Sequence, residues 1–194
     1  MCGRFENNIQ VEDLFEALQT KGAPVKVELP RENIAPTQKI MTVVEKGNEL
    51  SLIPMNWGIK FSEGSHLIFN SRIETIKEKP YWQRLFSENK CLVPMTAFYE
   101  WKKEGTRKVP YRIFLPNERF FFVPALYVEK DMQLYASLIT TAPNKFIEKL
   151  HNRMPVILKM NEALEYLRCD SETNLNKCVP LSSAEKMDME QVTL

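Results

Sequence analysis

The sequence predicts an α+β fold: a single domain with a mixed, largely antiparallel, barrel-like β-sheet core and a few short flanking helices. The chain has 194 residues, which is the usual size of one domain. Many short segments rich in β-branched and aromatic residues are separated by turn residues, as is typical of antiparallel sheets and barrels. Because these segments do not alternate regularly with helical ones, a Rossmann-type parallel sheet is disfavoured.

Helical spacing predicts a first helix near the start of the chain, which residues 21–24 end. Its apolar face consists of Val11, Leu14, Phe15 and Leu18. Further short helices are expected over 80–86 and 143–150. A last helix, capped by Asn161, is expected near the C-terminus. Residues 161–194 are therefore predicted to form a C-terminal helix and tail of the same domain.

Strands are predicted where apolar and β-branched residues form short runs. A hairpin is expected from the turn residues 46–48, which separate the runs 41–44 and 50–54. The later predicted strands are 91–94, 97–101, 109–115, 119–128, 133–141 and 155–158. Cys91 begins the first of these and is expected to be buried.

Composition narrows the function classes. The chain has 26 Lys and Arg against 25 Asp and Glu, so any basic groove for nucleic acid must be local. No apolar run is long enough to span a bilayer, no apolar signal segment follows Met1, and the four cysteines lack metal-site spacing. We therefore expect an intracellular, cytoplasmic monomer without membrane contact, with no cofactor and no metal.

Cys2 offers a chemistry that no internal cysteine has. Its side chain is small, so methionine aminopeptidases would remove Met1 and leave an amine and a thiol on one residue. Such an aminothiol condenses with an aldehyde to a thiazolidine, and its two groups titrate near neutrality, at about 8 and about 8.5. From its position alone, Cys2 is better interpreted as a small apolar residue near a frayed terminus.

Three other segments place polar groups beside apolar ones. The amide of Asn70 suits a sugar hydroxyl and Arg72 suits a phosphate, although a strand-to-turn junction explains both. Glu100 stands between aromatic residues, where burial raises a carboxyl pKa, unless it lies on the wet face of a sheet. His151 stands at a predicted helix end, which favours imidazolium, and a capping role explains it equally well.

Six segments taken together resemble the SRAP (SOS-response-associated peptidase) family. Each segment is short, but they occur in the family's order and spacing from residue 2 to about 160. They are M-C-G-R-F at 1–5, N-I-A-P-T-Q at 33–38, W-G at 57–58, F-N-S-R-I-E-T at 69–75, C-L-V-P-M-T-A-F-Y-E-W at 91–101 and H-N-R-M-P-V-I-L at 151–158.

The resemblance implies an activity on DNA. SRAP proteins bind single-stranded DNA that contains an abasic site, and their N-terminal cysteine crosslinks to the open-chain aldehyde as a thiazolidine. This shields the lesion from strand cleavage and error-prone bypass. The residues that match the family's catalytic positions are Cys2, Asn70, Glu100 and His151. Those that match its DNA-binding positions, or suit base contacts, are Arg4, Pro36, Arg72, Trp101 and Arg153.

The resemblance also suggests separate roles for these residues. Glu100 is the expected acid and base for opening the sugar ring, and His151 is expected to assist ring opening or crosslink reversal. Asn70 is expected to position Cys2 or the sugar. Two departures from the family pattern stand out. After the W-G segment, a DNA-facing aromatic of the family is either missing or replaced by Phe61, and Ala97 stands where the family often has glycine.

Two other function classes remain open. A thiol peptidase or amidase would use Cys2 as nucleophile with His151 as base, in line with the first activity proposed for the family. A plain single-strand or RNA-binding module would bind intact and abasic strands alike, and Cys2 would then be incidental.

Overall fold

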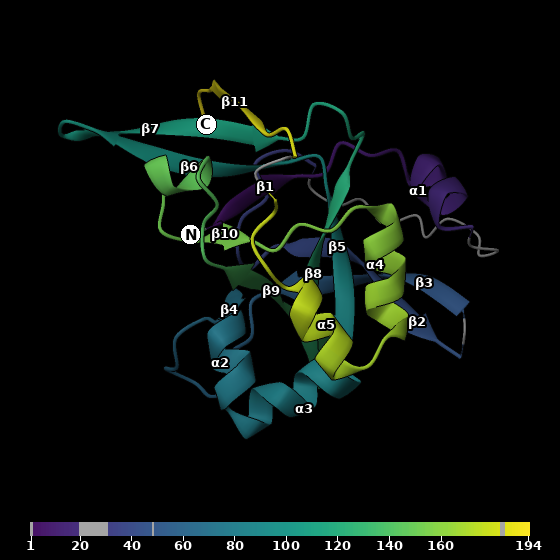
Figure 1. The fold of residues 1–194 in the computed structure, drawn as a ribbon. Helices are drawn as coiled ribbons and strands as arrows, with labels where there is room; N and C mark the ends of the chain where they lie inside the picture. Colours follow the sequence, from purple (N-terminus) through teal and green to yellow (C-terminus); the bar gives the residue numbers. More distant parts are fainter. Residues whose placement is uncertain (1, 20–30, 48, 183–184) are drawn as a thin grey trace.

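A computed structural model describes residues 2–19, 31–47, 49–182 and 185–194, and the predicted helix end at 21–24 lies outside these ranges. The strands are β1 (Arg4–Glu6), β2 (Lys39–Lys46), β3 (Glu49–Trp57), β4 (Asn70–Arg72), β5 (Lys90–Met95), β6 (Ala97–Glu104), β7 (Arg107–Phe114), β8 (Phe121–Lys130), β9 (Gln133–Thr141), β10 (Met154–Pro155) and β11 (Asp188–Gln191). The helices are α1 (Val11–Leu18), α2 (Ile73–Glu78), α3 (Pro80–Glu88), the 3₁₀ turn η1 (Ile147–Lys149), α4 (Met160–Arg168) and α5 (Ser171–Lys177) (Figure 1).

Five strands close into a mixed barrel in the order β9-β3-β2-β5-β8, with β8 pairing back to β9. Every neighbouring pair in the ring is antiparallel except β3 and β9. The wall continues beyond the ring, because β4 pairs with β9 in parallel and β10 pairs with β9 antiparallel. The predicted α+β fold with a mixed, largely antiparallel, barrel-like core is confirmed.

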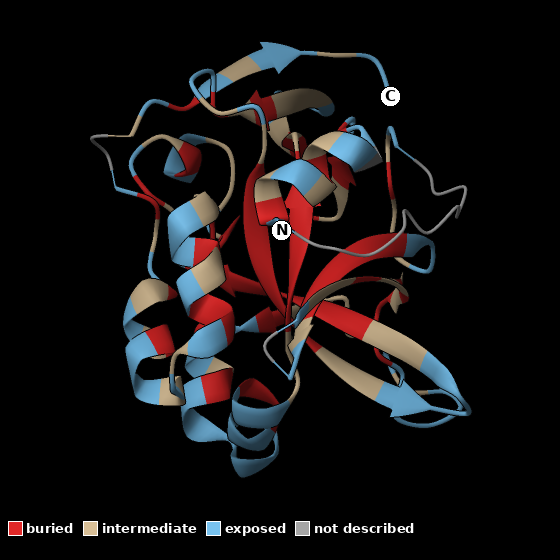
Figure 2. Cartoon of the chain, turned by 90° about the vertical axis from the view of Figure 1, so that its right-hand side faces the viewer, coloured by how far each residue is buried: buried red, intermediate tan, exposed pale blue. Residues whose placement is uncertain are grey.

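Side-chain alternation along the barrel strands divides the core into two clusters. In β5, Cys91, Val93 and Met95 belong to one cluster, whereas Leu92 belongs to the other. The second cluster includes Phe86 and other helix residues, so it fills the space between the barrel wall and the helices. The first cluster therefore fills the barrel interior, which accounts for the buried central strands in Figure 2.

A second sheet, ordered β1-β6-β7-β11 and antiparallel throughout, lies at one end of the barrel (Figure 1). Phe5 in β1 packs its ring 5.0 Å from that of Trp57, and both belong to the interior cluster. The beginning of the chain is therefore anchored in the barrel core and is not a frayed terminus.

The helix predictions succeed where a helix covers the barrel. α1 has the predicted residues, and α3 begins with Pro80 at its first position, where a missing N–H costs no helical hydrogen bond. The helix predicted over 143–150 is wrong, because only η1 forms. Oδ1 of Asn144 accepts hydrogen bonds from the backbone N–H groups of residues 146 and 147, as an N-cap residue does, but the turn ends where the N–H groups of residues 150 and 151 both bond to the Ile147 carbonyl.

The C-terminal region holds more structure than a helix and a tail. α4 begins two residues earlier than expected, with Lys159 and not Asn161 at the cap position. α5 follows, and β11 pairs with β7 at the edge of the second sheet. The predicted strand 155–158 is short, since β10 ends at Pro155 and Leu158 forms only a bridge to Phe122. Within the described residues, no helix has the length and apolar character that crossing a membrane needs.

Candidate active site

Cys2 lies two residues before the start of β1, and its side chain is fully buried. Nδ2 of Asn70, the first residue of β4, donates a 2.8 Å hydrogen bond to the backbone carbonyl of Cys2. The two residues meet because β4 is held against β9 in the barrel wall, with Asn70 opposite Leu138. Oδ1 of Asn70 is buried and accepts no hydrogen bond from a described residue. A buried acceptor without a donor is rare, so this oxygen is suited to a ligand.

Glu100 lies in β6 and is only 2% exposed. Burial raises the pKa of its carboxyl group. Burial also raises the pKa of the Cys2 thiol, and the negative charge of Glu100 raises it further. The two side chains are therefore within electrostatic reach, and burial favours the protonated form of each.

His151 follows η1 in a loop that is tied back to the barrel. Its Nδ1 accepts a 3.0 Å hydrogen bond from the backbone N–H of Arg153, so the proton of the neutral ring is on Nε2. Burial lowers the pKa of His151 and favours the neutral imidazole. The expected imidazolium at a helix C-terminus is not supported, because a single 3₁₀ turn has no extended dipole.

Arg153 is bound mainly to the protein. Its guanidinium forms two parallel 2.9 Å hydrogen bonds with the Glu74 carboxylate in α2, and Nη2 also donates to the Thr140 carbonyl in β9 across 2.8 Å. The side chain is 12% exposed. These contacts join the His151 loop to α2 and to the barrel. A phosphate contact of Arg153 stays a prediction and would share this guanidinium.

The other predicted DNA-binding residues lie closer to the surface. Nη1 of Arg4 donates to Oδ1 of Asn33, which ties β1 to the loop 33–38. Pro36, in this loop, and Trp101 are half-buried, and Arg72 is exposed.

Side-chain alternation assigns the residues of β6 to two faces. Phe98 is buried in the barrel cluster, so Glu100 shares the barrel-facing side. Tyr99 and Trp101 then lie on the outer face, and Arg4 joins them because it is paired with Tyr99. The structure brings Cys2 together with Asn70 and Glu100, and it puts Arg4 and Trp101 on the opposite face of this sheet.

A family model described as SOS response associated peptidase (SRAP) matches residues 1–194. The chain belongs to the SRAP family. This SRAP protein is 34% identical over 179 residues to the Bacillus subtilis protein named abasic site processing protein YoaM, and the match covers 86% of this chain and 79% of the relative. It is 27% identical over 197 residues to the Escherichia coli protein named abasic site processing protein YedK, covering 93% and 88%.

Solved structures show the same fold. A crystal structure of a Bacteroides thetaiotaomicron protein superposes on this SRAP protein with a TM-score of 0.84 at 20% identity. The alignment covers 99% of this chain and 92% of that one. At this identity the likeness concerns the fold alone.

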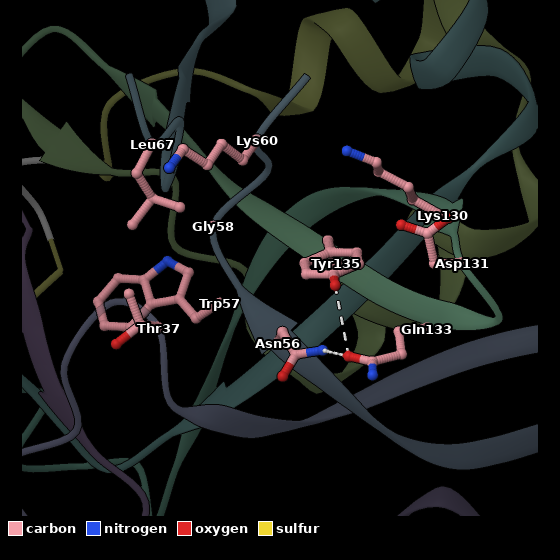
Figure 3. A pocket seen from close by; sticks show the side chains of 10 residues that line it. All are labelled: Thr37, Asn56, Trp57, Gly58, Lys60, Leu67, Lys130, Asp131, Gln133 and Tyr135. Atoms are coloured by element: carbon pink, nitrogen blue, oxygen red, sulfur yellow. Dashed lines mark hydrogen bonds between the residues drawn. The ribbon is translucent and has the colours of Figure 1, made fainter. Parts of the chain in front are cut away.

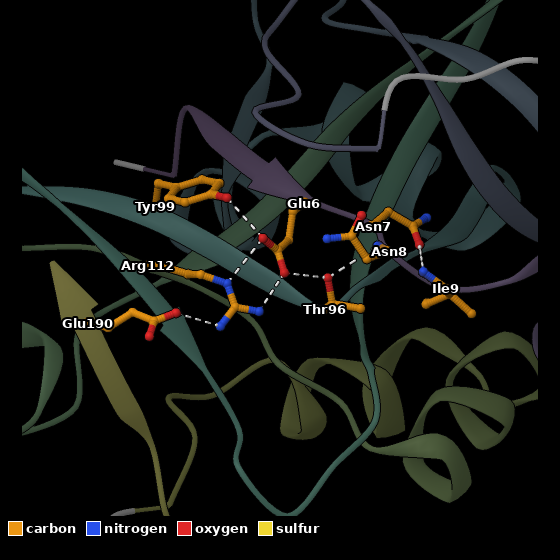
Figure 4. A network of polar contacts seen from close by, with 8 residues as sticks. All are labelled: Glu6, Asn7, Asn8, Ile9, Thr96, Tyr99, Arg112 and Glu190. Carbon is orange, nitrogen blue, oxygen red and sulfur yellow. Dashed lines mark hydrogen bonds and ion pairs between the residues drawn. The ribbon is translucent and has the colours of Figure 1, made fainter. Parts of the chain in front are cut away.

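A buried polar network that the sequence analysis did not single out holds β1 in place (Figure 4). The Glu6 carboxylate accepts hydrogen bonds from the Arg112 guanidinium, from Thr96 Oγ1 at 2.8 Å and from Tyr99 Oη at 2.9 Å. Burial alone would raise the pKa of Glu6, but these donors outweigh it and hold the pKa below its usual range. The network joins β1 to β6 and β7, four residues after Cys2. A charged residue within the apolar run 111–114 was the one signal for Arg112.

The W-G segment supports the strand that carries Asn70. Trp57 Nε1 donates a 2.8 Å hydrogen bond to the backbone carbonyl of Phe69. Gly58 has φ +120°, and a Cβ there would lie 2.7 Å from the Leu67 side chain, so only glycine fits.

A surface pocket of about 300 Å³ lies beside this segment (Figure 3). Trp57 and Gly58 line it with Thr37 of the loop 33–38, and Lys60 and Lys130 add positive charge. The residues predicted for catalysis or DNA binding are not among those that line it. Within the described part of the chain, no three His, Cys, Asp or Glu side chains form a group able to hold a metal ion.

Phe61, the residue at the first departure from the family pattern, is 45% exposed. Its ring packs edge-on against Tyr81 at 5.3 Å and Trp82 at 6.0 Å, both in α3. An exposed aromatic is therefore present after the W-G segment, although its contact with DNA stays a prediction.

Proposed function

We propose that this SRAP protein is an abasic-site sensor. It binds single-stranded DNA at the lesion and, once Met1 is removed, joins Cys2 to the open-chain sugar as a thiazolidine. The crosslink shields the lesion during the DNA damage response. The names of its relatives support abasic-site processing, and the residues around Cys2 support the covalent chemistry.

The observation that carries the proposal is the way Asn70 holds Cys2. Its Nδ2 binds the Cys2 carbonyl, while its Oδ1 is a buried acceptor with no donor among the described residues. The new α-amine of Cys2 and a sugar hydroxyl are both donors of the kind this oxygen requires. One amide would thus orient the nucleophile and the substrate together.

The chemistry needs one acid and one base, and Glu100 suits both roles in turn. The protonated carboxyl donates a proton to the ring oxygen while the anomeric hydroxyl gives up its own proton, to neutral His151 or to water, so the sugar opens to its aldehyde with no net change in protons. The Cys2 amine then attacks the aldehyde carbon, and one water leaves as the imine forms. The Cys2 sulfur next adds to the imine carbon and yields its proton, directly or through the carboxylate, to the nitrogen. Aldehyde plus aminothiol therefore gives thiazolidine plus one water.

The raised pKa values of Cys2 and Glu100 suit this order of events. A neutral thiol does not compete with the amine for the aldehyde, and a protonated carboxyl is available for ring opening. The neutral His151 offers a second site for proton transfer, in ring opening or crosslink reversal.

The test is a denaturing-gel and intact-mass assay with an untagged N-terminus. A single-stranded oligonucleotide with one abasic site should give a covalent species, whose mass is that of protein without Met1 plus DNA minus water. Cys2→Ala should keep DNA binding and lose this species, whereas Cys91→Ala, a second buried cysteine, should keep it. A heat-stable adduct formed by Cys2→Ala would refute the mechanism.

The thiol peptidase alternative has less support. A cysteine nucleophile needs a thiolate, and both burial and the charge of Glu100 act against the thiolate of Cys2. A peptidase should be inactivated by alkylation and should turn over peptide substrates, and these assays separate the two functions.

A further inference from the structure

The outer half of the β6–β7 hairpin, residues 101–110, is a basic arm. It carries four basic residues and one acidic residue between 102 and 108, in a chain whose formal net charge is +1. β11 pairs with β7 only as far as Tyr111, and Val192 N–H donates to the Pro110 carbonyl just beyond. Past that point the described strands pair only with each other, and the arm extends away from the barrel in Figure 1.

The strand register puts two lysines directly opposite each other. Lys103 is the cross-strand partner of Lys108, and both are exposed. Neither forms an ion pair with any residue that the structure describes. Like charges in this position destabilise a hairpin, and a two-stranded hairpin has little stability to spare. An anion between the two ammonium groups would remove the repulsion.

The lysine pair shares a face with residues already expected to contact DNA. Alternation along β6 puts Lys103 on the same face as Trp101, and the register adds Lys108 and Pro110. Arg4 belongs to this outer face as well. Since a strand rises about 3.4 Å per residue, the lysine pair lies about 7 Å beyond Trp101.

The outer face is not neutralised near these lysines. Two carboxylates of this face, Glu6 and Glu190, bind Arg112, and a third, Asp188, lies opposite Phe114 at the end of β7 away from the arm. Glu104, the acidic residue of the arm, lies on the opposite face and pairs with Lys102. Basic side chains next to a tryptophan form the combination by which proteins hold single strands without reading sequence.

We propose that Lys103 and Lys108 bind the phosphate backbone of single-stranded DNA next to the nucleotide that contacts Trp101. The inference rests on the proposed function for its choice of ligand. It makes the β6–β7 hairpin a positioning element that holds the flanking strand while the lesion reacts elsewhere.

The test measures binding of an intact 20-nucleotide oligothymidylate across a series of NaCl concentrations. Each phosphate contact with a single strand contributes about 0.7 to the slope of log affinity against log salt. Lys103→Ala/Lys108→Ala should reduce the slope by about 1.4. Between 50 and 200 mM salt the affinity of the variant should therefore fall about sevenfold less than that of the unmodified protein.

A charge reversal separates binding from folding. Lys103→Glu converts the like-charge pair into an opposite-charge pair, so its melting temperature should be unchanged or higher while its DNA affinity falls. The control is Lys46→Ala, compared with Lys103→Ala. Lys46 lies near the tip of the β2–β3 hairpin on the other side of the molecule in Figure 1, and its removal should leave the slope unchanged.

The inference would be overturned by an unchanged slope in the double variant. It would also be overturned if Lys46→Ala reduced the slope as much as Lys103→Ala. The probe has no aldehyde, so this result does not depend on crosslinking. If no adduct forms with abasic DNA but the slopes change as stated, the proposed function fails and the arm still binds DNA.

Discussion

Two buried glutamates on neighbouring strands of the same sheet have opposite environments. Glu6, in β1, is 5% exposed and is surrounded by donors from Thr96, Tyr99 and Arg112, which lower its pKa. Glu100, in β6, is 2% exposed, and burial raises its pKa. The first lies on the outer face of the sheet and the second on the barrel-facing side, beside Cys2.

The difference separates a carboxylate that its donors keep charged from a carboxyl group whose charged form burial disfavours. A carboxylate that accepts several hydrogen bonds from cationic and neutral donors is held in its charged form and fixes the strands around it. Where the effect of burial on a carboxyl pKa outweighs the effect of its partners, the pKa moves toward neutral pH. Such a group gives up and regains its proton more easily near neutral pH. Glu6 thus holds the strand that follows Cys2, and Glu100 is suited to act on what Cys2 binds.

The largest expected effect comes from Glu100→Gln. Because the amide cannot transfer a proton, the rate of adduct formation with abasic DNA should fall about 10³-fold, while folding is preserved. Single-turnover gel kinetics measure it. Glu104→Gln, an exposed substitution on the same face of the same strand, is the matched control and should react at the normal rate. An unaffected rate in Glu100→Gln would remove Glu100 from the mechanism.

Glu6→Gln should act mainly on stability. Removing the charged partner of Arg112 should lower the free energy of unfolding by about 3 kcal/mol, as expected when one half of a buried ion pair is lost. Urea denaturation measures it. At a temperature where the variant is folded, its adduct rate should fall far less than that of Glu100→Gln. Equal losses of rate would mean that the two glutamates do not differ in function.

The two glutamates should also differ in the pH dependence of stability. The lowered pKa of Glu6 contributes stability above the pKa of an unfolded glutamate, about 4.3, and this is lost as the pH falls toward the folded value. The raised pKa of Glu100 has the opposite sign, so its favourable contribution is lost as the pH rises through the folded value. Urea midpoints at pH 4 and pH 8 should show Glu6→Gln most destabilised at pH 8. Glu100→Gln should gain stability there, relative to the unmodified protein.

The smallest effect is expected for Tyr99→Phe. This change removes one neutral donor from Glu6 and leaves Arg112 and Thr96 bound, so stability should fall by about 1 kcal/mol. Thermal unfolding measures the loss. A loss as large as that of Glu6→Gln would show that the network depends on the phenol and not on the ion pair.

Local sequence predicted the strands well and the middle helices less well. The runs that became β5 to β9 carry β-branched and aromatic residues at strand spacing, a signal that any barrel wall needs. The helix predicted over 143–150 begins with a cap from the Asn144 side chain but stops after one 3₁₀ turn, and the chain then enters β10 and pairs with β9. That strand pairing is a tertiary contact, which helical periodicity does not report.

The sequence predicted which residues form the candidate site, but not how they are arranged in space. The sequence named Cys2, Asn70 and Glu100, and the six segments identified their family. It did not show that Arg153 binds Glu74, or that Glu6 and Arg112 hold the N-terminal strand, because these partners are 79 and 106 residues apart.

The sequence by itself determined the family, the barrel-like fold class and the residues capable of the chemistry, because these depend on residue type and local spacing. The tertiary structure alone decided which groups are buried, which carboxylate has donors and which face each side chain occupies. Those properties arise from strand pairing across long separations and from the exclusion of water, and they set the pKa values on which the proposed reaction depends.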